Sequence, residues 1–396
     1  MKFRLLLCLA IWVVALPAAT QAPPAKAPTA KPMRVYSLEL NGQWGAAISP
    51  DGRTVALAIQ HGGSGGDYSR YVEAELWDFR AKQRLAQRTL SHRPNFAVTT
   101  AEWGQVCYTG DGQVLLIYDG ELLHVLKAAN LEEITRIDLG LPAMPREAEV
   151  VDVAPPRTGH GLMAVMVSRG GGRGATVRVY DLHTGALRRA WAFEHGYPEW
   201  GSHLAWHPDG KKLAVTLLPL LPGQRVPEQE KNLEVLDVES GKVLARINTG
   251  YLVGPVAFTA DNRLLTATID MAWTLPSGLH AIRIWDASTA RVIREISGAP
   301  NGVRGSLVLS ADGKRVVGYI GREINQGFQP DPESTLGIFR QQFRLWELPG
   351  GRVVVTSPPI LPNPPKRPQL RLSAKGDFVL VFWRFPDQPV LVYEVH

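Results

Sequence analysis

The sequence contains very little cysteine, and the positions of its two cysteines exclude a disulfide framework. Cys8 lies in an apolar run near the N-terminus, and Cys107 stands alone in the rest of the 396 residues. A single thiol can form neither an intrachain disulfide nor a two-cysteine metal site. We therefore expect Cys107 to be a buried core thiol.

Motifs for metals, cofactors and nucleophiles are also missing. The ten histidines are scattered singly, without H-x-H or H-E-x-x-H spacing, so no metal site is predicted. The segments GGSGG (62–66) and GGGRGA (170–175) match a hydrolase and a dinucleotide pattern by letter. A strand is predicted after each of them, where the chemistry needs a helix. The sequence therefore predicts no catalytic, cofactor-binding or metal residue, and no cofactor.

An excess of positive charge is missing from most of the chain. The formal net charge is +6, from 43 Lys and Arg against 37 Asp and Glu. Four of the basic residues, Lys2, Arg4, Lys26 and Lys31, precede residue 33, which leaves 39 basic against 37 acidic groups. Nucleic-acid binding depends on excess basic charge, so no nucleic-acid partner is predicted.

Long hydrophobic runs are limited to the N-terminus. Leu5 to Leu16 form an apolar run between a basic start and small residues, which is typical of a secretory signal peptide, assigned to residues 1–21. Residues 22–32, APPAKAPTAKP, form a Pro/Ala-rich linker. We expect a bacterial protein exported to the periplasm or the medium, with no integral membrane span after cleavage. The alternative is an uncleaved anchor.

What the sequence does have is a repeat of about 53 residues. A short apolar segment ending in an aromatic or aliphatic residue plus an acid recurs, with the acid at Asp78, Asp181, Asp237, Asp286, Glu347 and Glu394. A weaker copy, LLHVLKA at 122, fills the one large gap. Tight-turn clusters such as SPDG at 49 and HPDG at 207 keep phase with this marker, and Asp-Gly there favours hairpins. The third copy, VAPPRTGHG at 153, is irregular.

The seven copies predict the architecture. Each copy consists of strand a, a tight turn, strand b, a variable connection, strand c, a turn and strand d. Seven such units describe an all-β, seven-bladed β-propeller of four-stranded antiparallel blades over residues 33–396 as a single domain. The last copy, VLVYEVH, lacks its strand d. The segment Arg34 to Leu40 is predicted to supply this strand beside Val390 to Val395 and close the ring.

The strand-c markers carry a family resemblance. Trp77-Asp78 and Trp285-Asp286 reproduce the signature dipeptide of WD-repeat proteins, and Tyr180-Asp181, Trp346-Glu347 and Tyr393-Glu394 approximate it. The markers therefore resemble the WD-repeat and related bacterial propeller families over residues 33–396. The Gly-His element of WD repeats is missing in every copy, which is typical of a divergent member.

The connections suggest a function. The b-to-c and d-to-a connections leave an up-and-down blade on the same face. In this sequence they are the long ones, with the segment from Gly321 to Arg340 the largest. We therefore predict a non-catalytic module that binds a protein or a cell-envelope partner through these connections, with a monomer as the default. The candidate partner-binding residues are Arg70, Tyr71, Trp200, Trp273, Arg322 and Phe328.

An enzyme is the alternative. A lactonase-like or quinoprotein-like propeller carries its site over the central channel, and such a site gathers residues from many blades without leaving a local sequence pattern. The fold alone cannot distinguish the two hypotheses.

Overall fold

The structure is a computed structural model that describes most of residues 33–395. The described ranges are 33–39, 43–61, 71–92, 106–120, 122–141, 150–157, 159, 161–168, 174–193, 203–217, 231–249, 253–259, 261–268, 281–297, 307–320, 342–358, 360, 369–383 and 388–395. They belong to one compact unit, Pro32–His396. None of the described residues lies in a helix that is long and apolar enough to cross a membrane.

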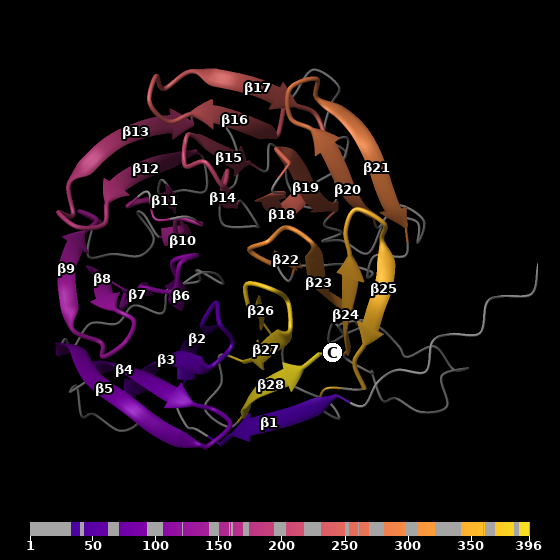
Figure 1. Cartoon of the computed structure of the whole chain (residues 1–396). Helices are drawn as coiled ribbons and strands as arrows, with labels where there is room; N and C mark the ends of the chain where they lie inside the picture. The colour runs from indigo at the N-terminus through magenta and orange to yellow at the C-terminus, as the bar shows by residue number, and fades with distance from the viewer. Residues whose placement is uncertain are drawn as a thin grey trace, which may run out of the picture. The chain divides into compact units, whose positions relative to one another are not determined.

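Within these ranges, twenty-eight strands form seven four-stranded antiparallel sheets, which follow one another around a ring (Figure 1). Blades 1 to 3 consist of β2 (Gln43–Ile48), β3 (Thr54–His61), β4 (Tyr71–Asp78) and β5 (Gln83–His92); β6 (Val106–Tyr108), β7 (Val114–Tyr118), β8 (Leu122–Lys127) and β9 (Glu133–Asp138); and β10 (Val150–Ala154), β11 (Leu162–Ser168), β12 (Ala175–Asp181) and β13 (Leu187–Phe193). Blades 4 and 5 consist of β14 (Leu204–Trp206), β15 (Lys212–Thr216), β16 (Leu233–Asp237) and β17 (Val243–Ile247); and β18 (Val253–Phe258), β19 (Arg263–Thr268), β20 (Ala281–Asp286) and β21 (Arg291–Ser297). Blades 6 and 7 consist of β22 (Leu307–Leu309), β23 (Arg315–Ile320), β24 (Gln342–Glu347) and β25 (Arg352–Thr356); and β26 (Gln369–Leu372), β27 (Phe378–Phe382), β28 (Val390–Glu394) and β1 (Arg34–Leu38). The predicted seven-bladed β-propeller is confirmed.

The burial of each strand follows its place in the blade. A second strand lies between the two neighbouring blades on both faces, so it is apolar at nearly every position, and β27 is buried at all five. An outer strand has one face in solvent, and β17 accordingly alternates between exposed and half-buried side chains along most of its length. The strand-c aromatics pack between blades, as Tyr393 does edge-to-face against Phe343 of blade 6 with ring centroids 5.0 Å apart.

The two ends of the propeller meet in blade 7. Strand β1 pairs antiparallel with β28 in a register that runs from Arg34 opposite Glu394 to Leu38 opposite Val390. The Tyr36 hydroxyl also donates to Glu394 Oε2 at 3.1 Å. Figure 1 shows the two strands side by side, the first at the N-terminal end of the colour scale and the second at its C-terminal end. The predicted ring closure is therefore confirmed, so β28 has no open edge.

The a-to-b turns have the conformation that their Asp-Gly sequences predict. Gly52 has φ of 69°, the equivalent Gly112, Gly210 and Gly313 have φ of 71° or 72°, and Gly376, which follows Lys375 and not an aspartate, has φ of 76°. This left-handed region favours glycine. At Gly52 a Cβ atom would also lie 2.4 Å from the Phe378 ring of blade 7, so glycine is required there for packing as well.

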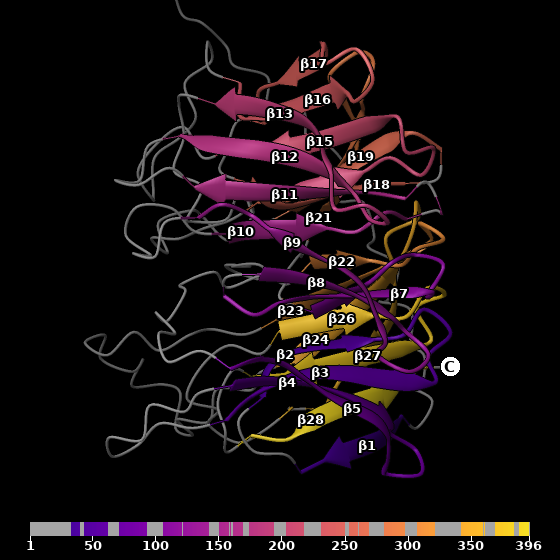
Figure 2. The ribbon, with the colours of Figure 1, turned by 90° about the vertical axis from the view of Figure 1, so that its left-hand side faces the viewer.

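The two faces of the propeller carry connections of very different length. The a-to-b and c-to-d turns lie on one face, here named the turn face, and the longest of them is 155–161. The b-to-c and d-to-a connections leave from the opposite face, here named the connection face, and include 93–105, 217–232 and 321–341. Figure 2 shows the strands running between these two faces. The predicted one-sided distribution of connection length follows from the strand bounds.

Candidate functional site: the central cavity

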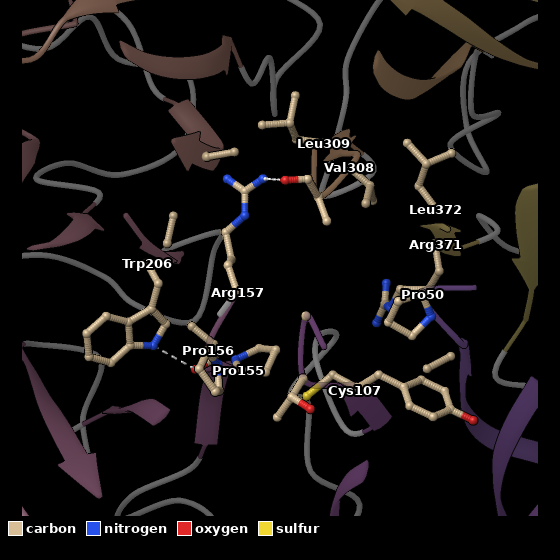
Figure 3. A pocket seen from close by; sticks show the side chains of 18 of the residues that line it. Pro50, Cys107, Pro155, Pro156, Arg157, Trp206, Val308, Leu309, Arg371 and Leu372 are labelled. Atoms are coloured by element: carbon tan, nitrogen blue, oxygen red, sulfur yellow. Dashed lines mark hydrogen bonds between the residues drawn. The ribbon is translucent and has the colours of Figure 1, made fainter. Parts of the chain in front are cut away.

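The inner strands surround a cavity of about 320 Å³ at the end of the channel near the turn face. We name it the central cavity. All seven blades line it through their inner strands or the turns that follow. Its polar or bulky lining includes Asp152, and Pro50, Cys107, Arg157, Trp206 and Arg371, which Figure 3 labels. Most of the other lining side chains are Ala, Val, Leu, Ile and Pro. A mainly apolar cavity with a few polar groups is typical of small-molecule sites.

Arg157 connects blades on opposite sides of the cavity. It follows Pro155 and Pro156 in the long a-to-b turn of blade 3, and its guanidinium donates to the carbonyl oxygens of Phe258 in blade 5 and of Ser310 and Ala311 in blade 6. The Ser310 bond is 3.2 Å long. Figure 3 shows the side chain reaching toward the strand of Val308 and Leu309. Burial lowers the pKa of Arg157 from its ordinary value. The three carbonyl oxygens accept hydrogen bonds from the guanidinium and so compensate part of its lost hydration.

Backbone hydrogen bonds connect neighbouring turns around the same mouth. Gly110 N of blade 2 donates to Pro156 O of blade 3 at 2.8 Å, and Ala374 N of blade 7 donates to Pro50 O of blade 1 at 2.9 Å. A Cβ atom at Gly110 would lie 2.0 Å from Arg157 O, so a larger residue does not fit there. The irregular turn of the third repeat is therefore the segment that crosses the mouth of the channel.

Asp152 is the buried carboxyl group of the cavity. It lies on β10, and its Oδ2 accepts a hydrogen bond of 2.8 Å from Leu204 N of blade 4. Burial raises the pKa of Asp152 to about 6, an effect that the Leu204 N–H and the charge of Arg371 reduce in part. His203 Nδ1 lies 3.8 Å from Asp152 Oδ2. Burial, followed by the charge of Arg371, lowers the pKa of His203 to about 3, so this imidazole is neutral at pH 7.

Arg371 brings the positive charge into the cavity from β26 of blade 7. Its Nη1 donates to Leu370 O at 2.9 Å, and its guanidinium carbon lies 5.5 Å from the centre of the Phe382 ring. Burial lowers the pKa of Arg371, whereas the nearby Asp152 and Cys107 act in the opposite direction. Cys107 lies on the wall of the cavity and is half-buried. We predicted a buried core thiol, and the structure has Cys107 partly buried and packed against the hydrophobic core. Burial raises its pKa to about 12, which keeps it protonated.

Of the six predicted partner-binding residues, one lies in the part of the chain that the structure describes. Tyr71 begins β4 at the connection face, and its ring stacks on His61 with centroids 4.5 Å apart. His61 Nε2 lies 2.9 Å from Glu73 Oε2. Arg70, Trp200, Trp273, Arg322 and Phe328 lie outside the described residues, so their role stays a prediction.

Sequence reasoning did not find the residues of the central cavity. Asp152 and Arg371 lie on blades 3 and 7 and share no local motif. The one available signal was the departure of PPRTG at 155–159 from the Asp-Gly turns of the other copies. Among the described residues, no group of three or more His, Cys, Asp or Glu side chains is arranged to hold a metal ion.

The ring of four-stranded blades and the channel at its centre define the class of the protein, a seven-bladed β-propeller. A solved structure titled hydrazine synthase, from Kuenenia stuttgartiensis, is similar to this chain with a TM-score of 0.54 and 15% identity, over 89% of this chain and 96% of that chain. At this identity the likeness concerns the fold alone. No family model and no curated protein matches the sequence, so the resemblance to WD-repeat proteins and a bacterial origin stay predictions.

Proposed function

We propose that this chain is an exported, non-catalytic propeller that binds a protein or a cell-envelope partner through its connection face. The observation that carries the proposal is the difference between the two faces. The turns of the turn face are short, and backbone hydrogen bonds join some of the neighbouring ones, as Gly110 N to Pro156 O and Ala374 N to Pro50 O. The connection face carries segments such as 217–232 and 321–341, and connections of this length are uncommon in a compact domain unless they are functional or disordered.

The composition of the long connections supports a binding role. The predicted residues Arg70, Trp200, Trp273 and Arg322 fall in segments that leave from the connection face, and Arg, Trp and Tyr are enriched at the energetic centres of interfaces. Tyr71, at the start of β4, is half-buried against His61. A rigid ring that presents such segments from seven blades is well suited to holding a partner without chemistry of its own.

A replacement of the longest connection tests this proposal. Residues 323–338 are exchanged for a short Gly-Ser linker, and a control variant receives a Gly-Ser insertion between Glu239 and Ser240, which are exposed on the turn face. Loop length changes closure entropy only weakly, so both variants should melt close to the unmodified protein. The partner that copurifies with the unmodified protein should be lost from the replacement variant alone. Full retention of the partner would place the interface elsewhere.

Export is part of the proposal and has its own test. The basic start, the apolar run and the small residues of 1–21 are the basis for expecting a signal peptide. Mass spectrometry of the protein isolated from its native cells should find an N-terminus between residues 18 and 33 in the exported fraction. An intact Met1 in a cytoplasmic fraction would refute export.

A second candidate function, catalysis on a small molecule, is favoured by one specific observation. Asp152, a buried carboxyl group of the cavity wall, and His203, whose Nδ1 lies 3.8 Å from Asp152 Oδ2, both have shifted pKa values, and such groups gather at catalytic sites. Turnover of lactones or sugars that survives replacement of 323–338, but is lost on Asp152→Asn, would support catalysis over the binding module.

A further inference from the structure

Arg371 has far more hydrogen-bonding capacity than its protein surroundings use. A guanidinium carries five N–H donors. Within the part of the chain that the structure describes, the guanidinium makes one hydrogen bond, to Leu370 O, and no ion pair. Arg157, the other arginine of the cavity, differs because three carbonyl oxygens accept its donors. Arg371 is therefore the cation that is available to a molecule inside the cavity.

The surroundings of Arg371 make this arrangement costly without an anion. A charge that is removed from bulk water loses hydration, and a close counterion with matching hydrogen bonds offsets this loss. Asp152 acts on Arg371 through its charge, but its Oδ2 accepts the Leu204 N–H. An incoming anion would supply the acceptors that the described residues do not place against the guanidinium.

We propose that the central cavity binds a small monocarboxylate with an apolar body, held by its carboxylate against the Arg371 guanidinium. The planar fork of a guanidinium matches the two oxygens of a carboxylate. The walls that remain for the rest of the molecule are apolar, as at Ala47, Val308 and Leu372. The volume of about 320 Å³ is at the lower end for small-molecule sites, which excludes large ligands.

Asp152 gives this site a pH dependence. An ionised Asp152 repels a second carboxylate in the same cavity, and protonation removes the repulsion. Its pKa of about 6 places this change between pH 5 and pH 7. The other titratable or charged groups that face Asp152 are His203, Cys107 and Arg371, with Arg157 on the same wall. His203 and Cys107 stay neutral over that range, so the titration of Asp152 determines how the affinity for a carboxylate changes with pH.

Calorimetric titration with sodium hexanoate tests the proposal. Hexanoate should bind the full chain, and the affinity should be at least threefold higher at pH 5.0 than at pH 7.5. The variant Asp152→Asn should bind hexanoate with little dependence on pH. The variant Arg371→Met, which keeps the length of the side chain and removes its charge, should lose at least tenfold in affinity. Arg53→Met is the matched control, because the Arg53 side chain is 81% exposed, and it should bind hexanoate unchanged.

Further measurements distinguish the proposal from its rivals. Without ligand at pH 5.0, where Asp152 is mostly protonated, Arg371→Met should melt close to the temperature of the unmodified protein, since the guanidinium makes one hydrogen bond to the described residues. If Arg371→Met fails to fold, Arg371→Lys replaces it, and should fold and lose at least tenfold in affinity. 1-Hexanol should bind much more weakly than hexanoate, and chloride at equal concentration should not displace hexanoate. Three results would each overturn the proposal. Hexanoate does not bind, the Arg371 variant and Arg53→Met both bind it as tightly as the unmodified protein does, or chloride at equal concentration displaces it fully.

Discussion

Replacing Asp152 by asparagine should change the pH dependence of folding stability in a defined direction. Burial raises the pKa of Asp152 to about 6 in the folded protein, whereas an aspartate in an unfolded chain has a pKa of about 3.9. The folded protein thus binds this proton more tightly than the unfolded chain does. The contribution of Asp152 to the free energy of unfolding is therefore most favourable below pH 4 and falls as the pH rises to about 6.

The magnitude follows from the difference between the two pKa values. One pKa unit corresponds to about 1.4 kcal/mol, so a difference of about two units makes ionised Asp152 cost about 3 kcal/mol of stability above pH 6. The amide introduced by Asp152→Asn keeps an oxygen for the Leu204 N–H and carries no charge. Relative to the unmodified protein, Asp152→Asn should therefore gain about 3 kcal/mol between pH 4 and pH 7.

Urea unfolding of both proteins at pH 4.0, 5.0, 6.0 and 7.0 measures this difference. Subtracting the free energy of unfolding of the unmodified protein from that of the variant removes the contributions of groups whose titration is the same in both. Asp181→Asn provides a control of opposite sign, because hydrogen bonds from Arg188 and from backbone N–H groups lower the pKa of the Asp181 carboxyl. That variant should be less stable than the unmodified protein, and because the loss develops below the unfolded pKa of about 3.9, the difference should be nearly constant from pH 4.0 to pH 7.0. A difference for Asp152→Asn that is flat, or that falls toward pH 7, would refute the reasoning about burial.

Two further predictions concern the ring itself. Arg157→Ala removes the guanidinium from three carbonyl oxygens in blades 5 and 6, and because water in the cavity can replace part of these bonds we expect a loss of about 2–4 kcal/mol in urea unfolding. Arg53→Ala is the control and should change the free energy of unfolding by less than about 0.5 kcal/mol. An equally small effect of Arg157→Ala would show that the hydrogen bonds of Arg157 to blades 5 and 6 contribute nothing to stability. Deletion of residues 33–40 removes β1, and the lost burial of Leu38 alone corresponds to about 2 kcal/mol. A chain that starts at Met33 should melt like the full chain, and equal melting of both truncated chains would contradict ring closure.

The fold could be predicted because it repeats. Most of the seven copies carry the same two markers in phase, and a propeller follows from their period even though the second copy has Lys127 in place of the acid and the third lacks the Asp-Gly turn. The closure by β1 was predictable because the last copy lacks its strand d, and an additional strand precedes the first copy. These features are local in sequence, and the hydrophobic pattern of each strand reports them directly.

The cavity could not be predicted because its residues are not local. Arg371 is a single charge in QLRL and Asp152 a single charge in VVDVA, and each looks like an ordinary polar position of a half-exposed strand. Only the curvature of the ring brings blades 3 and 7 to the same cavity. The sequence did mark the third copy as different, through Pro155, Pro156 and the missing Asp-Gly turn, but this signal did not identify Arg157 as a cavity residue.

The distribution of lysine between the two faces offers a direct test of the binding function. The lysines of the turn face are Lys82, Lys127, Lys211, Lys212, Lys242, Lys314 and Lys375. The connection face carries Lys231, and by its place in the sequence also Lys366. The protein is isolated with its bound partner from native cells and treated with an amine-reactive crosslinker, and the crosslinked peptides are identified by mass spectrometry. The account predicts crosslinks from the partner to Lys231 and Lys366, although seven of the nine lysines of residues 33–396 lie on the opposite face. Crosslinks concentrated on those seven would contradict it.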